Sequence, residues 1–180
     1  GYFKQSLDSE GNQKETYLVY DPSNLPMVPA RNSAGKEFIS EIDIGADKVF
    51  FKVWLSKIGR ISLYLLDTNL PQNPDHLKDI TKNLYTGDRE KRLQQEILIG
   101  IGGISALAEM GIEPLVSHMN EGHSATLILE RISRLMNINK LTWEQAREFV
   151  KATSVFTTHT PVPAGNEYFD PWLVYKLLKD

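Results

Sequence analysis

The chain has 180 residues, of which 41% are hydrophobic and 24% are charged, and its formal net charge is −3. This composition suffices for one domain with one good core, and the weak negative charge without long like-charge runs favours neither nucleic acid nor an anionic membrane as a partner. No apolar run approaches the about 18 residues of a membrane-spanning helix, and the absence of cysteine excludes disulfides and thiolate chemistry and suits the cytoplasm, where we expect the protein.

Both ends of the sequence look like cuts in a longer chain. The sequence begins at Gly1 without a methionine, and it ends within the helical pattern 172–180, where no Gly or Pro terminates the helix. We therefore expect a piece of a longer polypeptide.

The first third of the chain carries β-type patterns. Alternating, β-branched and aromatic residues predict strands at 15–20, 37–44 and 48–56, with turn residues between them. These strands favour a meander of hairpins. A further strand at 60–67 is apolar enough to be buried, and a polar loop with two prolines follows it at 71–88.

The pattern after residue 58 alternates between strands and helices. This alternation predicts an α/β fold with a parallel sheet and helices on both faces. We therefore expect two parts, a β-rich segment at 1–57 and a parallel α/β part at 58–180. The expected helices are 89–110, 124–136, 141–151 and one that starts after Asp170, and the expected later strands are 113–119 and 154–158.

Three glycines stand inside the longest helical pattern, at Gly100, Gly102 and Gly103. Each costs about 1 kcal/mol relative to Ala in a helix interior, so we expect another backbone or a ligand to approach closely there. The sequence GIGGIS lacks the third glycine of a dinucleotide-binding motif, and it follows a helical run instead of a strand. Helix packing is therefore favoured over phosphate binding.

Two of the predicted strands end in polar residues that include a histidine. Met119–His123 follows the first strand, and Thr158–Pro161 follows the second, where proline cannot continue a ladder. Because parallel strands end at one edge of a sheet, and ligands bind at this edge, the two histidines together indicate a ligand site. Either histidine alone would more often be a structural hydrogen-bonding group.

Other chemistries fit the sequence less well. A metal site drawn from His118, Glu121, His123 and His159 lacks the H-E-x-x-H spacing, so we expect no metal. No G-x-S-x-G nucleophile motif is present. Acidic residues that could form a glycosidase pair lie on different elements, and Glu96 is expected to be a surface or packing charge.

Four long segments resemble the α-glucan phosphorylases of the short bacterial and archaeal type. The resemblance runs over nearly the whole chain, and the opening stretches GYFKQ and LDSEGNQ are similar to the segment after the family's substrate-loop glycines. The related glycogen and starch synthases share the architecture, but their last segment resembles T-x-H-N where this chain has THTPVPAGN. The four segments are, in order, LYLLDTNLPQN, LYTGD with RLQQEILIGIGG, HMNEGHSATLILERI, and FTTHTPVPAGN.

The resemblance implies an internal piece of the N-terminal domain of a two-domain GT-B glycosyltransferase, in which this piece is the Rossmann-like half with its β-rich segment. Such an enzyme transfers a terminal glucosyl unit from an α-1,4-glucan to phosphate and releases glucose 1-phosphate with retention. It uses pyridoxal phosphate, whose lysine lies in parts absent from this sequence. The piece alone is therefore expected to be inactive and to bind no cofactor. The resemblance also implies contact with the C-terminal domain of the same polypeptide, and a homo-oligomeric, allosteric parent.

The resemblance also assigns site residues. His159 resembles the family histidine at the glucosyl subsite, which contacts the sugar and offers its backbone carbonyl to developing positive charge, and Thr160 lies beside it. Asn120, Glu121 and His123 resemble the N-[DE]-x-H segment that lines the same pocket. The family's asparagine-rich gate loop has no clear counterpart, so acceptor-side residues stay unassigned. A glucan-binding or regulatory module without chemistry remains an alternative, and so does a metal-dependent hydrolase.

Overall fold

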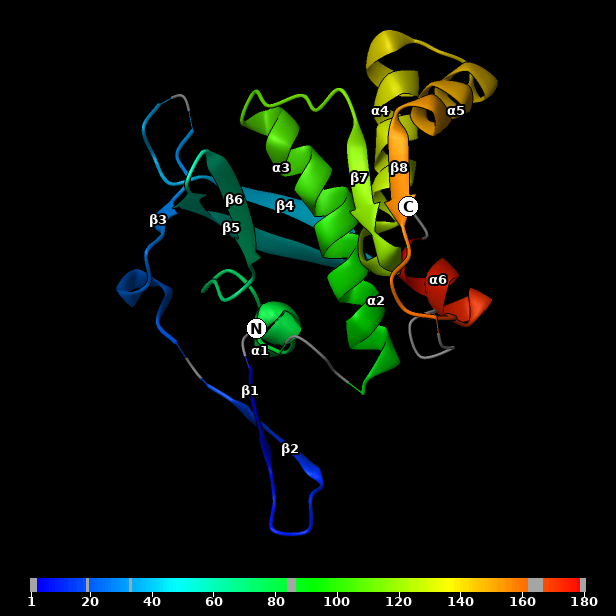
Figure 1. Cartoon of the computed structure of the whole chain (residues 1–180). Coiled ribbons are helices and arrows are strands. Elements are labelled where there is room, and N and C mark those ends of the chain that lie inside the picture. The colour runs from blue at the N-terminus through cyan, green and yellow to red at the C-terminus, as the bar shows by residue number, and fades with distance from the viewer. Residues whose placement is uncertain (1–2, 19, 33, 84–86, 162–166, 179–180) are drawn as a thin grey trace. The chain divides into compact units, whose positions relative to one another are not determined.

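The structure is a computed structural model, and it describes residues 3–18, 20–32, 34–83, 87–161 and 167–178 (Figure 1). The chain folds into two compact units. The first comprises Gly1–Ile39 and Val49–Asp88, and the second comprises Ser40–Lys48 and Arg89–Asp180. Within the described ranges, no helix is both long and apolar enough to cross a bilayer.

The first unit is built mainly from antiparallel strands, as the β-type patterns predict. The strands β1 (Phe3–Leu7) and β2 (Gln13–Tyr17) form a hairpin, while β3 (Val28–Pro29) and β6 (Ile61–Asp67) both pair with the long strand β5 (Asp47–Ile58). Alternate residues of β5 are fully buried, as expected for a strand with one face on a core. These residues are Val49, Phe51 and Val53.

The expectation that strand 60–67 joins a parallel sheet is wrong, because β6 pairs antiparallel with β5. Ile58 pairs with Ile61, which leaves only Gly59 and Arg60 between the strands, and Gly59 has a φ of 59°. A turn of two residues can join only antiparallel strands, since a parallel pair needs a crossover of a dozen or more residues. The short turn therefore overrides what the apolar run of β6 suggests.

The polar residues that follow β6 are part of the fold. The Asn73 side chain accepts a hydrogen bond from the Phe50 N–H at 2.9 Å and donates to the Phe50 and Thr68 carbonyls at 2.6 and 2.8 Å. Asn73 and Thr68 are both buried. The segment predicted as a loop contains a short helix, α1 (Asp75–Lys78), and two 3₁₀ turns complete this unit, η1 (Pro22–Asn24) and η2 (Asp79–Thr81).

The second unit combines a parallel strand pair with helices. The strands β7 (Ser117–Asn120) and β8 (Ser154–Thr157) run parallel, with Asn120 opposite Thr157 at their ends. This pairing and the mixed α/β composition agree with the predicted class. The helices are α2 (Arg89–Ile97), α3 (Gly103–Glu109), α4 (Leu127–Asn139), α5 (Trp143–Ala152) and α6 (Pro171–Leu177).

The ends of the later helices follow from local capping. The Thr142 hydroxyl accepts from the Gln145 N–H while the Gln145 side chain accepts from the Thr142 N–H, which forms a capping box at the start of α5. The Asp170 carboxylate caps α6 by accepting from the Trp172 N–H at 2.7 Å. Between α4 and α5 lies an apolar core of Ile132, Ala146 and Val150, with Ile128, Leu135 and Leu141 around it.

The strand β4 (Ile39–Ile44) contributes to the second unit from Ser40 onward. Its Ser40, Ile42 and Ile44 are buried in alternation. The Ser40 hydroxyl donates to the Glu109 carboxylate at 2.8 Å, and the Gly45 N–H after the strand donates to the Leu177 carbonyl at 2.9 Å. These bonds attach the segment to the ends of α3 and α6.

A π-helical segment, η3 (Leu98–Gly102), joins α2 to α3, so that they run on as one long helix (Figure 1). A side chain at Gly100 would overlap the Thr126 hydroxyl and would lie 2.6 Å from the Leu127 nitrogen. The predicted close backbone approach is therefore confirmed at Gly100. At Gly103, by contrast, a Cβ would meet nothing within 4 Å. The Thr126 hydroxyl donates to the Glu96 carbonyl at 2.8 Å, one turn before Gly100.

Candidate functional site

The parallel pairing of β7 and β8 brings the segments after both strands to one edge of the sheet. Asn120 and Thr157 are the last residues of the two strands and lie opposite each other. His118 is bonded across the pair, with its Nε2 2.6 Å from the Thr157 hydroxyl. The two histidine-containing segments that follow therefore begin side by side.

The Glu121 carboxylate joins these two segments. Its Oε1 accepts hydrogen bonds from the N–H groups of His159 and Thr160, each at 2.8 Å. Glu121 is buried, opens the 3₁₀ turn η4 (Glu121–Ser124), and has a left-handed backbone with a φ of 59°. The hydrogen bond from the His159 backbone, and then those from Thr160, lower the pKa of Glu121 below its ordinary value. The carboxylate is therefore charged at neutral pH.

The ring of His159 is held by Asn120 and remains exposed. Because the Asn120 Oδ1 can only accept, the His159 Nε2 donates to it. The other ring nitrogen stays free of this bond. The imidazole is thus oriented by a neighbour on β7 while its ring faces solvent.

His123 is held by a different partner, the guanidinium of Arg92, which donates to its Nδ1. Since a guanidinium cannot accept, the ring proton of His123 lies on Nε2, which is 3.9 Å from the Glu121 Oε2. Arg92 is buried, and its Nε lies 3.1 Å from both carboxylate oxygens of Glu167 and 3.4 Å from the Glu96 Oε1.

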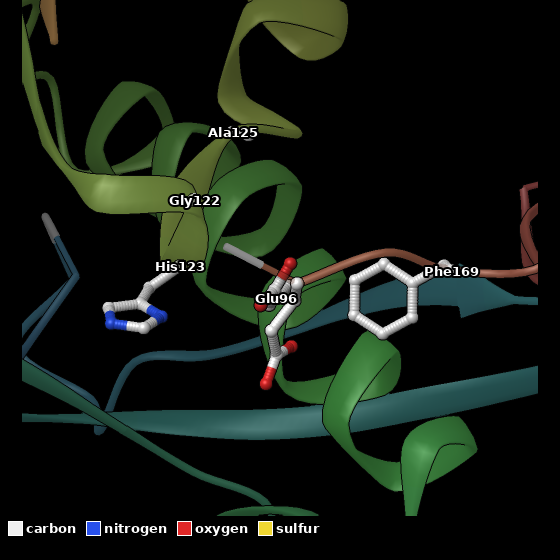
Figure 2. Close-up of a pocket in the computed structure, with 6 residues that line it drawn as sticks. Glu96, Gly122, His123, Ala125 and Phe169 are labelled. Atoms are coloured by element: carbon white, nitrogen blue, oxygen red, sulfur yellow. The ribbon is translucent and has the colours of Figure 1, made fainter. Parts of the chain in front are cut away.

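A cavity of about 180 Å³ opens beside this cluster. It is lined by Glu96, Gly122, His123, Ala125, Glu167 and Phe169. In Figure 2 the Glu96 side chain lies between the rings of His123 and Phe169. Burial raises the pKa of Glu96 to about 7, and the Glu167 carboxylate adds to this rise while Arg92 opposes it. The cavity wall therefore carries a carboxyl group that titrates near neutral pH.

Among the residues predicted for the site, Asn120, Glu121, His159 and Thr160 are joined directly by hydrogen bonds. His123 lies next to them through Glu121. Arg92 and Glu167 were not predicted as site residues. Glu96, interpreted as a surface or packing charge, is buried and therefore not at the surface. The available signal was the i, i+4 spacing of Arg92 and Glu96, each of which directly precedes an apolar residue of the helix, Leu93 and Ile97.

The carboxylates and histidines of the cluster are not arranged around a common point. Over the described part of the chain, no group of three or more His, Cys, Asp or Glu side chains is placed to hold a metal ion. What the cluster offers is a set of oriented hydrogen-bond donors and acceptors on strand ends. Such a set can fix the hydroxyl groups of a small polar ligand.

Replacing Glu96 with Gln should change how stability depends on pH. The folded-state pKa of about 7 lies above the ordinary 4.5, so the folded chain binds more protons between these values. The contribution of Glu96 to stability is therefore present below pH 4.5 and is lost as the pH rises through 7. Relative to the wild type, the Glu96→Gln variant should gain roughly 2 to 3 kcal/mol in free energy of unfolding between pH 4.5 and pH 8.

Urea unfolding of both proteins across this pH range measures the effect. The matched control is Glu148→Gln, because the Glu148 side chain is 57% exposed and forms an ion pair with its neighbour Arg147. A constant difference between Glu96→Gln and wild type at all pH values would contradict the raised pKa.

The chain matches curated relatives along nearly its whole length, while no protein-family model matches it. It is 41% identical to a glycogen phosphorylase of Mycobacterium tuberculosis over an alignment of 186 positions, which covers 100% of this chain and 22% of that protein. It is 42% identical to a maltodextrin phosphorylase of Thermococcus litoralis, with 94% of this chain and 20% of that protein covered. It is 34% identical to a glycogen phosphorylase of Aquifex aeolicus, with 90% and 23% covered.

The chain spans about a fifth of the length of these relatives. The aligned region includes the two strand ends and the helices that surround them. Identity of this level over 90% or more of the chain establishes common descent. The chain belongs to the glycogen and maltodextrin phosphorylase family.

Proposed function

We propose that the full-length protein is an α-glucan phosphorylase that transfers a terminal glucosyl unit from an α-1,4-glucan to phosphate and releases glucose 1-phosphate. One observation carries this proposal. The ends of β7 and β8 meet, and Glu121 and Asn120 tie His159 and Thr160 into one hydrogen-bonded edge. The resemblance puts the glucosyl subsite at these residues, and the names of the relatives, which are glycogen and maltodextrin phosphorylases, support the proposed activity.

The proposed roles follow from what each group can do. His159 contacts the sugar and turns its backbone carbonyl toward the reacting carbon, where positive charge develops in an oxocarbenium-like transition state. A fixed carbonyl dipole stabilises such a charge more than mobile water does, because it needs no reorganisation. Asn120, His123 and Thr160 line the pocket and hydrogen-bond to sugar hydroxyls. The resemblance also places Glu121 in this pocket, although the backbone groups of His159 and Thr160 occupy one of its carboxylate oxygens.

The proposal includes the fold of the parent domain. The β-rich segment at 1–57 and the α/β part at 58–180 would belong to the N-terminal domain of a GT-B enzyme, and the α/β part would be its Rossmann-like half. The parallel β7–β8 pair with its surrounding helices supports this assignment. The pairing of β6 with β5 shows that the start of the α/β part departs from a simple parallel arrangement.

We further propose pyridoxal phosphate as the cofactor of the full-length protein, where its phosphate group supplies acid–base chemistry. The residues of this cluster do not fit the cofactor, since carboxylate, amide, imidazole and hydroxyl groups offer no amine for its aldehyde. None of them is therefore assigned to it. The further partners proposed are phosphate, the C-terminal domain of the same polypeptide and a second copy in an allosteric homo-oligomer, in the cytoplasm.

Phosphorolysis tests the proposal. The full-length protein, supplied with pyridoxal phosphate, maltodextrin and inorganic phosphate, should release glucose 1-phosphate, and omission of phosphate should abolish the release. Maltodextrin binding without any product would replace the proposal with a non-catalytic glucan-binding module. Release of free glucose without phosphate would point to a hydrolase.

A further inference from the structure

We infer that Glu121 is a positioning residue, whose carboxylate anchors the backbone at His159 and Thr160 and thereby aims the His159 carbonyl. This inference rests on the proposed function, because the carbonyl matters only if a charged transition state forms beside it. It differs from the substrate contact that the resemblance gives to Glu121. The residue would act through His159 and not on the sugar.

The first step of the argument is how the carboxylate is occupied. Both N–H groups, of His159 and of Thr160, donate to the same oxygen, Oε1, at 2.8 Å. The other oxygen, Oε2, lies 3.9 Å from the Nε2 of His123. With only 11% of its side chain exposed, Glu121 has its charge directed at the protein backbone. Hydrogen bonds to an ionised acceptor are stronger and shorter than those between neutral groups.

The second step concerns the peptide unit between His159 and Thr160. The N–H of Thr160 and the carbonyl of His159 belong to one planar group, and no cis peptide bond occurs among the described residues. In a trans peptide the N–H and C=O bonds point in opposite directions. An anchor on the Thr160 N–H therefore fixes the direction of the His159 carbonyl, away from Glu121. A negative charge on the N–H side also polarises the carbonyl oxygen further.

The third step is that the backbone of Glu121 itself is shaped for this contact. Its φ of 59° is left-handed, a conformation that residues with a Cβ rarely adopt. The hydrogen bond from the His159 N–H also contributes most to lowering its pKa, so the anchor keeps its charge at neutral pH. The left-handed backbone of Glu121 and its negative charge therefore both belong to the contact with the N–H groups of His159 and Thr160.

Three variants in the full-length protein separate the possible roles of Glu121. Glu121→Gln keeps the side-chain length and an oxygen that can accept both hydrogen bonds, whereas Glu121→Met keeps the length and has no oxygen. Glu121→Ala removes the acceptor. Glu148→Gln is the matched control, since Glu148 is exposed on α5 and forms an ion pair with its neighbour Arg147.

Steady-state phosphorolysis of maltodextrin should show a fall in kcat of about 10- to 100-fold in Glu121→Ala and Glu121→Met, with KM changed less than about threefold. Glu121→Gln should retain kcat within about fivefold of wild type. The reason is that an aimed carbonyl acts on the transition state, while bound sugar in the ground state does not need it. A mainly raised KM in Glu121→Ala would overturn the inference in favour of a direct sugar contact.

Amide hydrogen exchange of the same proteins, without substrate, measures how strongly the hydrogen bonds to Glu121 protect the His159 and Thr160 amides. This measurement does not depend on activity. The amides of His159 and Thr160 should exchange at least about tenfold faster in Glu121→Met than in wild type, and at an intermediate rate in Glu121→Gln, which keeps the acceptor oxygen but loses the charge. Unchanged exchange in Glu121→Met would overturn the anchor. If Glu121→Ala does not fold, the Met and Gln variants are compared instead. If wild type forms no glucose 1-phosphate, the proposed function fails, and exchange alone decides whether the anchor exists.

Discussion

Replacing Gly100 with Ala should destabilise the protein by about 3 kcal/mol or more in free energy of unfolding. The added Cβ would overlap the Thr126 hydroxyl and lie 2.6 Å from the Leu127 nitrogen and 3.0 Å from the Thr126 carbonyl carbon. Two of these atoms are backbone, so a side-chain rotation cannot relieve the overlap. Moving the chain at Thr126 would also break its hydrogen bond to the Glu96 carbonyl.

Urea unfolding of wild type and variant measures this loss, and Gly103→Ala is the matched control. Gly103 lies three residues further along, has helical angles of −63° and −46°, and has open space where a Cβ would stand. Ala at 103 should therefore stabilise the helix by about 0.5 to 1 kcal/mol. A Gly100→Ala protein as stable as wild type would mean that α4 does not lie against the π-helical segment.

Replacing His159 with Ala in the full-length protein should lower kcat/KM for phosphorolysis by roughly 10- to 1000-fold, or about 1.4 to 4 kcal/mol. With the proposed role of His159, the variant would lose a sugar hydrogen bond as well as the contact to Asn120, and the turn would loosen somewhat. It keeps the backbone carbonyl, so the loss should be smaller than that of a unique catalytic group. The melting temperature should change little, because the ring is exposed and contributes few buried contacts.

Steady-state kinetics test the predicted fall in kcat/KM, and a thermal melt of the same preparation tests the unchanged melting temperature. His118→Ala is the control, because His118 is also exposed near the ends of the two strands, with its ring bonded to Thr157. Its kcat/KM should stay within about threefold of wild type. Wild-type kinetics in His159→Ala would show that His159 is not at the glucosyl subsite. Loss of activity together with several degrees in melting temperature would make His159 a structural histidine.

Local signals predicted most of the elements. Thr142 with Gln145, and Asp170 with Pro171, mark helix starts through caps that depend only on neighbouring residues. The alternation in β5 likewise marks a strand with one buried face. The pairing of β6 was missed because an apolar run suits a buried parallel strand as well as a hairpin arm. The two-residue turn at Gly59 and Arg60 was the feature that decided for antiparallel pairing with β5.

The candidate site was predictable only where it follows strand ends. Parallel strands share an edge, so the segments after β7 and β8 could be placed together from the sequence. The contacts of Arg92 with Glu96, His123 and Glu167 could not be predicted in this way. Arg92 and Glu167 are 75 residues apart, and no local pattern links a helix residue to a glutamate near the end of the chain. The buried position of Glu96 likewise depends on tertiary packing.

The π-helical segment also keeps the two parts of the long helix in rotational phase. An α-helix advances about 100° per residue, but a π-helical turn holds more residues than an α-helical turn, so it takes up one extra residue without rotating the helix that follows by that angle. Arg92 and Glu96 lie before the segment, whereas Ser105, which donates to Glu130 of α4 at 2.9 Å, lies after it. Deleting one residue between 98 and 102 should therefore let the segment close as a regular α-helix, with Ser105 still facing Glu130 and Arg92 still on its own side. One residue added within α3, where no wide turn absorbs it, should instead rotate the helix after it by about 100°.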